Sequence, residues 1–290
     1  MHKFLRAIGF SEITKKDLEM ILDEVITRPE IMKITKDSEG NEFAELSGSF
    51  AANAGITVRG TYQEDDSFHM DYYYPYVFGT SITTNEQIDV EKHAEKESYA
   101  GVCDEVNLGV TLIFYIQNVA DYLAETNRHL SKIHYGAMLA GLSTEGKILC
   151  PVVERKKNDV PAIQKNDRHN QLIAQAREGD EDAIESLTLE DMDTYALLSQ
   201  RVMKEDIFSI VKSTFMPFGI ESDQYTVLGE IIDCVTMENK LTHEKLYGMK
   251  LLCNNIQFDV CINEKDLLGE PAIGRRFRGN VWMQGNLCLE

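Results

Sequence analysis

Three arginines lie close together near the C-terminus, in the stretch GEPAIGRRFRGNVWMQG. They are Arg275, Arg276 and Arg278, and the only tryptophan of the chain, Trp282, follows four residues later. Guanidinium groups bind carboxylates and phosphates through paired N–H donors, and an indole ring can stack on a base or a sugar. The stretch therefore predicts a surface that binds a small anionic ligand.

A final strand over residues 278–289 decides which way these side chains face. The period of two in a strand predicts a core face formed by Val281, Met283, Leu287 and Leu289. Trp282 and Gln284 then share a polar face next to the arginine-rich loop. The candidate ligand-binding residues are Arg275, Arg276, Arg278, Trp282 and Gln284. In the structural alternative, Trp282 packs under the helical segment and the arginines pair with Glu264, Asp266 and Glu270.

A second candidate is the stretch FHMDYYYPY, in which His69 and Asp71 fall on one face of a strand. Such a pair can bind a divalent metal or transfer a proton, but a metal site needs a third ligand and the spacing supplies none. The alternative is a polar outer face on an edge strand marked by Pro75. An enzyme, either a hydrolase or a metal-dependent one, is therefore the alternative function, with His69 and Asp71 as its candidate residues.

Composition narrows the classes of function. With 29 Lys and Arg against 48 Asp and Glu, the formal net charge is −19, which disfavours binding to nucleic acids and anionic membranes. The six cysteines include no C-x-x-C pair and are expected to be reduced thiols. Neither a signal peptide nor a bilayer-spanning run is apparent, so we expect a cytoplasmic protein. The sequence lacks the common phosphate-loop, dinucleotide, metalloprotease and nucleophile-elbow motifs, and we expect no cofactor.

The elements that must position these residues fall into three segments, and the predicted class is α+β. Residues 1–155 predict a helix that begins at Thr14, followed by an antiparallel sheet with hairpin turns at QEDDS and STEGK. Residues 156–221 predict a helical segment, with a helix that starts at Asp180 and a last helix that runs to Pro217.

Residues 222–290 return to strand periodicity in four extended runs. They are YTVLGEIIDCV, KLYGMKLLC, IQFDVCI and RGNVWMQGNLCL, and Gly229 could bend the first so that it serves as two strands. Five short strands predict a small closed barrel of the oligonucleotide/oligosaccharide-binding (OB) type. The alternative is an open sheet that joins the N-terminal one.

Several stretches together resemble a known family. They are MHKFLRAIGFSEI, GVCDEVNLGVTLIFYIQN, GLSTEGKILCPV, EDIFSIVKSTFMPFGIESDQYTVLGEI and GEPAIGRRFRGNVWMQG. They are similar to a family of uncharacterised bacterial proteins, a domain of unknown function from anaerobic Gram-positive bacteria. The resemblance implies a cytoplasmic bacterial protein of this length, without an assigned activity, cofactor or catalytic residue.

The residues and the resemblance together favour a non-enzymatic binding or scaffold protein. The expected partner is either another protein or a small anionic ligand bound by the C-terminal β region.

Overall fold

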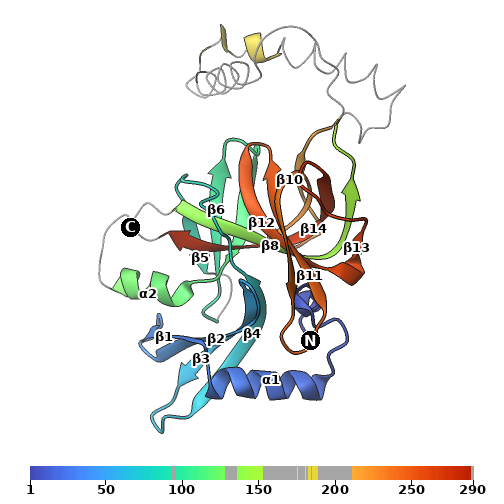
Figure 1. Ribbon diagram of the computed structural model, residues 1–290. Helices are drawn as coiled ribbons and strands as arrows, with labels where there is room; N and C mark the ends of the chain where they lie inside the picture. The colour runs from blue at the N-terminus through green and yellow to red at the C-terminus, as the bar shows by residue number, and fades with distance from the viewer. Residues whose placement is uncertain are drawn as a thin grey trace. The chain divides into compact units, whose positions relative to one another are not determined.

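The computed structural model describes residues 1–92, 96–127, 136–152 and 211–288, together with positions 175, 180, 182, 183 and 185–188. The chain divides into two compact units. Met1–Cys150 and Ser213–Glu290 make up the first, and Pro151–Lys212 make up the second. The described fold is mixed α+β and consists mostly of strands (Figure 1).

The chain begins with two helical segments and a four-stranded sheet. The 3-10 helix η1 (Lys3–Ile8) precedes α1 (Lys15–Thr27), which begins where predicted, because the side chain of Thr14 accepts a hydrogen bond from the Asp17 amide. The apolar face of α1 is buried. The sheet is an antiparallel meander of β1 (Ile31–Lys36), β2 (Glu42–Ala51), β3 (Ala54–Tyr62) and β4 (Phe68–Val77), with α1 below it in Figure 1.

The remaining strands of the first unit form one ten-stranded sheet. Its members are β5 (Asp89–Lys92), β6 (Tyr99–Glu105), β7 (Val110–Ile116), β8 (Gly136–Leu149), β9 (Thr214–Pro217), β10 (Gln224–Glu238), β11 (Lys245–Cys253), β12 (Ile256–Asn263), β13 (Leu267–Leu268) and β14 (Arg276–Cys288). Helix α2 (Val119–Asn127) follows β7, and the 3-10 helix η2 (Glu264–Asp266) follows β12.

Five of these strands close into a barrel, in the order β8, β12, β11, β10 and β14. The ring closes because β8 pairs in parallel with β12 on one side and antiparallel with β14 on the other. The predicted closed barrel is therefore present, and the four C-terminal runs provide four of its strands. The fifth strand, β8, comes from the N-terminal half of the chain. Strand β10 changes partners along its length, from β14 to β11 near Glu230.

Two local predictions are wrong. The stretch STEGK does not form a turn, because β8 runs through it and pairs with β14 along its whole length, with a bulge near Asn280. Thr214–Pro217, predicted as the end of a helix, form strand β9, in which Phe215 pairs opposite Val227 of β10. β-branched and aromatic residues fit a half-buried strand as well as a helix, so tertiary pairing decides.

Most of the predicted helical segment lies outside the described residues. Within the second unit, Asp180 Oδ1 accepts hydrogen bonds from the amides of Asp182 and Ala183, at 3.0 and 3.2 Å. This is the capping geometry that the sequence predicts for Asp180.

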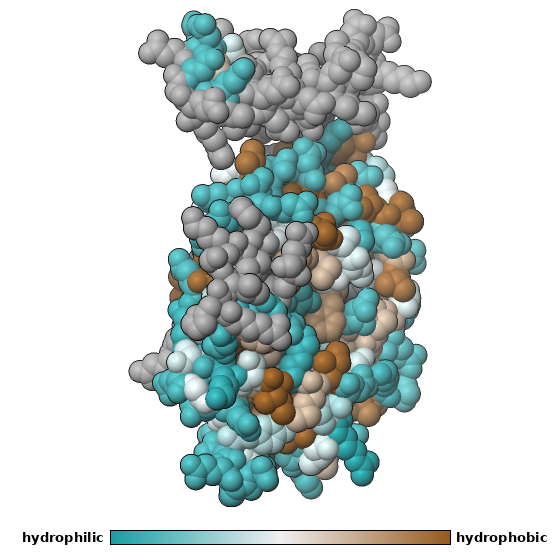
Figure 2. Space-filling model, turned by 90° about the vertical axis from the view of Figure 1, so that its left-hand side faces the viewer, coloured by the Kyte–Doolittle hydropathy of each residue, from teal (hydrophilic) through white to brown (hydrophobic). Residues whose placement is uncertain are grey.

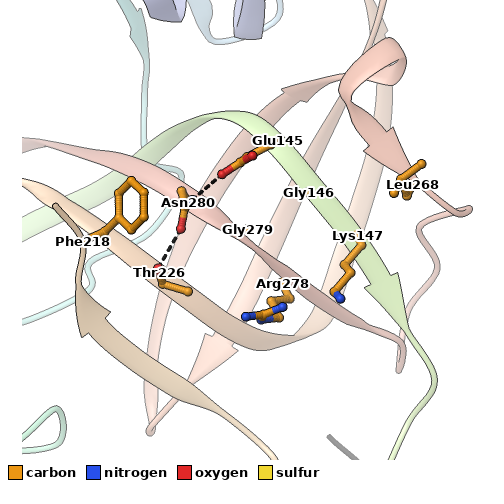
Figure 3. A pocket seen from close by; sticks show the side chains of 9 residues that line it. All are labelled: Glu145, Gly146, Lys147, Phe218, Thr226, Leu268, Arg278, Gly279 and Asn280. Carbon is orange, nitrogen blue, oxygen red and sulfur yellow. Dashed lines mark hydrogen bonds between the residues drawn. The ribbon is translucent and has the colours of Figure 1, made fainter.

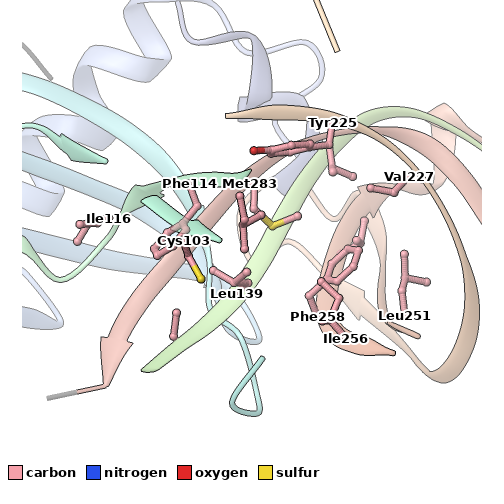
Figure 4. Close-up of a cluster of buried hydrophobic side chains, with 14 of the residues drawn as sticks. Cys103, Phe114, Ile116, Leu139, Tyr225, Val227, Leu251, Ile256, Phe258 and Met283 are labelled. Atoms are coloured by element: carbon pink, nitrogen blue, oxygen red, sulfur yellow. The ribbon is translucent and has the colours of Figure 1, made fainter. Parts of the chain in front are cut away.

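The first unit contains two hydrophobic clusters. One occupies the barrel and its junction with β6 and β7, and includes Phe114, Leu139, Tyr225, Phe258 and Met283 (Figure 4). The other lies between the outer surface of the barrel and the N-terminal elements, and includes Phe4, Leu22, Ile56, Tyr76 and Trp282. Strand β14 contributes to both clusters, and both of its faces are buried over residues 281–285.

A fully buried arginine joins the two sheets. Arg59 of β3 is 0% exposed, and its Nε donates to Glu45 Oε1 of β2 at 2.7 Å. Its Nη1 donates to the hydroxyls of Tyr72 and Tyr115, and its Nη2 donates to the Tyr74 hydroxyl. We call this group the Arg59 node. It crosses from the four-stranded sheet to β7 of the ten-stranded sheet.

The node also fixes the segment between β7 and α2. Arg59 Nη2 donates to the carbonyl oxygens of Ile116 and Gln117, at 3.0 and 2.8 Å. The Glu45 carboxylate accepts from the first amides of α2, those of Val119 and Ala120, at 3.2 and 3.1 Å. Burial alone lowers the pKa of Arg59, but the tyrosine oxygens and Glu45 raise it well above its usual value, so the guanidinium stays charged.

We expect Arg59→Met to reduce the free energy of unfolding by about 3–5 kcal/mol, because it leaves the buried Glu45 carboxylate without its counter-ion and removes the Arg59 donors from three hydroxyls and two carbonyls. Arg59→Lys keeps the charge but loses the planar set of donors, and we expect it to cost at least about 2 kcal/mol. Urea unfolding, followed by the fluorescence of Trp282, measures both.

The matched control is Arg28→Lys, the same exchange at an exposed position. It should change the free energy of unfolding by less than about 0.5 kcal/mol. An Arg59→Lys protein as stable as this control would refute the structural role of the node.

Candidate functional site

The candidate site is a groove on the outside of the barrel, with a volume of about 370 Å³. It lies over β8, β14 and β10 and is closed at its edges by Phe218 and Leu268 (Figure 3). Arg278, one of the residues singled out in the sequence, lines it together with Lys147. The two cations come from segments more than a hundred residues apart.

Strand register places the two cations directly opposite each other. Lys147 of β8 pairs with Arg278 of β14 in the antiparallel ladder, so their side chains emerge on the same outer face. Figure 3 shows both side chains at one end of the groove. Two cationic side chains on one face can both contact a single bound anion.

Polar side chains form the other end of the groove. Thr226 Oγ1 donates to Asn280 Oδ1 at 2.6 Å, and Asn280 Nδ2 donates to Glu145 Oε1. These bonds hold the Asn280 amide in one orientation across three neighbouring strands. The groove thus combines two cations, the Glu145 carboxylate, the ordered side chains of Thr226 and Asn280, and one aromatic ring, Phe218.

The other two arginines do not line this groove. Arg275 is exposed in the loop before β14, and its Nη1 donates to the Glu270 carbonyl at 2.7 Å. Arg276 is buried, its Nε donates to the Cys150 carbonyl at 2.9 Å, and burial lowers the pKa of its guanidinium. Arg276 therefore holds the end of β8 against β14.

Trp282 and Gln284 lie on the same face of β14 as Arg278, as the alternation predicts, but that part of the face is covered. Trp282 is 6% exposed, stacks on Phe4 at a ring-centroid distance of 5.3 Å and donates to Asp223 Oδ2 at 2.7 Å. Gln284 is fully buried, and its Nε2 donates to the Pro75 carbonyl. The expectation of an open polar face is wrong here, because η1 and the four-stranded sheet pack on it.

The structural alternative, in which Trp282 packs under another segment, is correct. The covering segment is the N-terminal one, however, and not the predicted helical segment. Two of the three carboxylates expected to pair with the arginines have other partners. Asp266 accepts from Arg6 at 2.5 Å, and Glu264 accepts from Lys245 at 2.7 Å.

His69 and Asp71 do not form a regular pair on β4. Arg59 pairs opposite Tyr72 and Gly60 pairs opposite Met70, so Asp71 is the extra residue of a β-bulge that interrupts the alternation. His69 is exposed. Among the described residues, no three His, Cys, Asp or Glu side chains come together as metal ligands would.

Sequence reasoning missed Lys147, Thr226 and Asn280. Lys147 belongs to the stretch STEGK, which predicted a turn, and Thr226 belongs to a run noted only for its strand periodicity. Once β8 and β10 are known to flank β14, register alone places Lys147 opposite Arg278 and Thr226 opposite Asn280.

His2 packs beside Trp282, and the centroids of the imidazole and indole rings are 4.9 Å apart. Its backbone amide donates to the Tyr73 hydroxyl, whereas its Nδ1 is buried and has no hydrogen-bond partner among the described residues. Burial, and then the neighbouring positive charge of Lys3, lower the pKa of His2 to about 4. The imidazole is therefore neutral in the folded protein at neutral pH.

Because the folded-state pKa lies below that of the unfolded chain, this histidine favours the folded state less as pH falls from 6.5 toward 4. We expect the wild type to lose roughly 3 kcal/mol more of its free energy of unfolding over this range than His2→Phe does. Urea unfolding at several pH values, with Trp282 emission as the probe, measures the difference. The control His69→Phe removes an exposed histidine, and a pH profile of His2→Phe that matches this control would contradict the burial of His2.

On the face shown in Figure 2, hydrophobic residues occur in separate groups among hydrophilic ones. None of the helices within the described ranges is long and apolar enough to cross a membrane.

Comparison with known proteins gives a family but no function. No curated protein matches the chain, and no solved structure matches it. One family model matches residues 5–285, nearly the whole chain, and its description reads "Domain of unknown function, E. rectale Gene description (DUF3881)". The chain belongs to this family of domains of unknown function, as the resemblance of its sequence stretches indicates.

Proposed function

We propose that this protein is a binding protein whose barrel groove holds a small anionic ligand, such as an organic phosphate or a polycarboxylate. The observation that carries the proposal is the direct opposition of Lys147 and Arg278 across β8 and β14 in a groove of about 370 Å³. A volume of this size accommodates a small metabolite and is too small for a folded partner.

The charge of the whole chain strengthens the argument from this pair. With a net charge of −19, the average surface repels anions, so a groove lined by two cations and one carboxylate is a local exception. A planar guanidinium supplies paired donors to a phosphate or carboxylate, and an ammonium adds a point charge. Asn280, fixed by Thr226 and Glu145, adds a polar wall that distinguishes one ligand from another.

We further propose that the barrel is of the OB type, with its fifth strand taken from β8. Such barrels bind ligands on the outer face of their strands and in the adjoining loops. The groove lies on the outer surface of three of the barrel strands, with Phe218 at its edge in the position of a stacking ring. The overall negative charge disfavours long nucleic acids and favours small anions.

Thermal melts with pyrophosphate, ADP, glucose 6-phosphate and citrate test the proposal. Binding to the folded state raises the melting temperature, and a ligand at about 100 times its Kd contributes about 2.7 kcal/mol, or about 5 °C for a chain of this size. We expect at least one of these anions to stabilise the wild type, and Arg278→Gln and Lys147→Gln each to abolish that effect.

Arg275→Gln is the matched control, since it removes the same charge three residues away and outside the groove. It should retain the ligand-induced shift. A shift that Arg275→Gln loses as fully as Arg278→Gln would indicate a general charge effect, and no shift with any of the four anions would contradict the proposed ligand class.

A further inference from the structure

A second cavity, of about 300 Å³, lies where the four-stranded sheet meets α2 and the ends of β7 and β14. It is distinct from the barrel groove and shares no lining residue with it. Figure 1 shows α2 beside β1 at this junction. The side chains that matter for its chemistry are Lys33, Glu45, Phe78, Gln117, Asp121 and Met138.

Gln117 lines this cavity and has an unused acceptor. Its Nε2 donates to the Val77 carbonyl at 2.9 Å and to Gln284 Oε1 at 2.7 Å, so both amide hydrogens are used and the orientation of the amide is fixed. Its Oε1 is buried and has no partner in the part of the chain that the structure describes, and the residue is only 5% exposed. A buried carbonyl oxygen without a donor is unfavourable, so the cavity favours an occupant that presents N–H or O–H groups.

One carboxylate at the cavity is open to exchange of its counter-ion. Glu45 and Asp121 both line it, but Glu45 is already paired with the buried Arg59 at 2.6 Å, so Asp121 is the carboxylate that an occupant can use. Lys33 Nζ contacts Asp121 Oδ2 at 2.6 Å, and both side chains are more than a third exposed. Because solvent screens such a partly exposed ion pair, another cation can readily replace Lys33 at Asp121.

We propose that this cavity binds a small primary ammonium compound, which donates to Gln117 Oε1 and takes the place of Lys33 as the counter-ion of Asp121. The short apolar chain of the ligand packs on Phe78 and Met138, which supply the nonpolar part of the wall together with Ile31 and Leu287. The volume of about 300 Å³ is at the lower end for ligand pockets and suits a molecule of a few carbon atoms.

The test compares n-butylammonium chloride with n-butanol and sodium butyrate, at matched ionic strength, by thermal melts and calorimetry of the full chain. We expect saturable binding of the ammonium compound alone. Asp121→Asn should weaken its affinity at least about tenfold. The control Glu91→Gln makes the same change of charge at an exposed position of β5 and should leave the affinity unchanged.

Three results would overturn the proposal. Binding of butanol as tight as that of butylammonium would remove the role of charge. Equal affinities in Asp121→Asn and Glu91→Gln would show that the acidic surface in general attracts the cation. A crystal structure with butylammonium at saturation that shows only water at Gln117 Oε1 would place the ligand elsewhere. None of these depends on the barrel groove, and Arg278→Gln should bind butylammonium like the wild type.

Discussion

A single buried charge sets the arrangement of the first unit. Removing a guanidinium from water is expensive, and it is tolerated only if every donor finds an acceptor of good geometry. The acceptors of Arg59 come from β2, β4, β7 and the turn before α2. All of these elements must be in place together, so the four-stranded sheet, the ten-stranded sheet and α2 are expected to form as one cooperative structure.

Strand β14 connects this arrangement to the candidate sites, because its residues line both of them. Its inner face fills the barrel throughout, with Phe277, Val281 and Met283 all nearly fully buried. Its outer face is covered at Trp282 and Gln284, where the four-stranded sheet and η1 pack, and is open at Arg278, beyond their edge. The barrel groove therefore begins where the covering ends, and the second cavity lies at the opposite end of the same interface.

Patterns along the chain predict the local elements well where they depend on nearby residues. Thr14 caps α1, and the runs KLYGMKLLC and IQFDVCI are strands β11 and β12, with their asparagine turn at positive φ. These predictions fail where the pairing or packing partners are distant in sequence. STEGK has turn composition, yet β14 holds it extended, and Trp282 has a polar neighbourhood in sequence that packing covers.

The residues of the candidate sites also differ in whether the sequence alone can reveal them. Arg278 could be found from composition, since arginines are scarce in this acidic chain and three of them cluster. Lys147 could not, because only the closure of the barrel by β8 brings it opposite Arg278. Arg59 and Gln117 carry no sequence signal, as an isolated arginine or glutamine is usually exposed. Their importance comes from contacts between segments up to 167 residues apart.

The most direct test of the central claim is native-state hydrogen exchange, resolved by segment, on the wild type and on Arg59→Lys. If the Arg59 node joins the two sheets, the slowest amides of β2–β4 and of the barrel strands should share one opening free energy in the wild type. In Arg59→Lys the amides of β2–β4 should then exchange faster than those of the barrel. Separate opening free energies for the two sheets in the wild type, left unchanged by Arg59→Lys, would contradict the account.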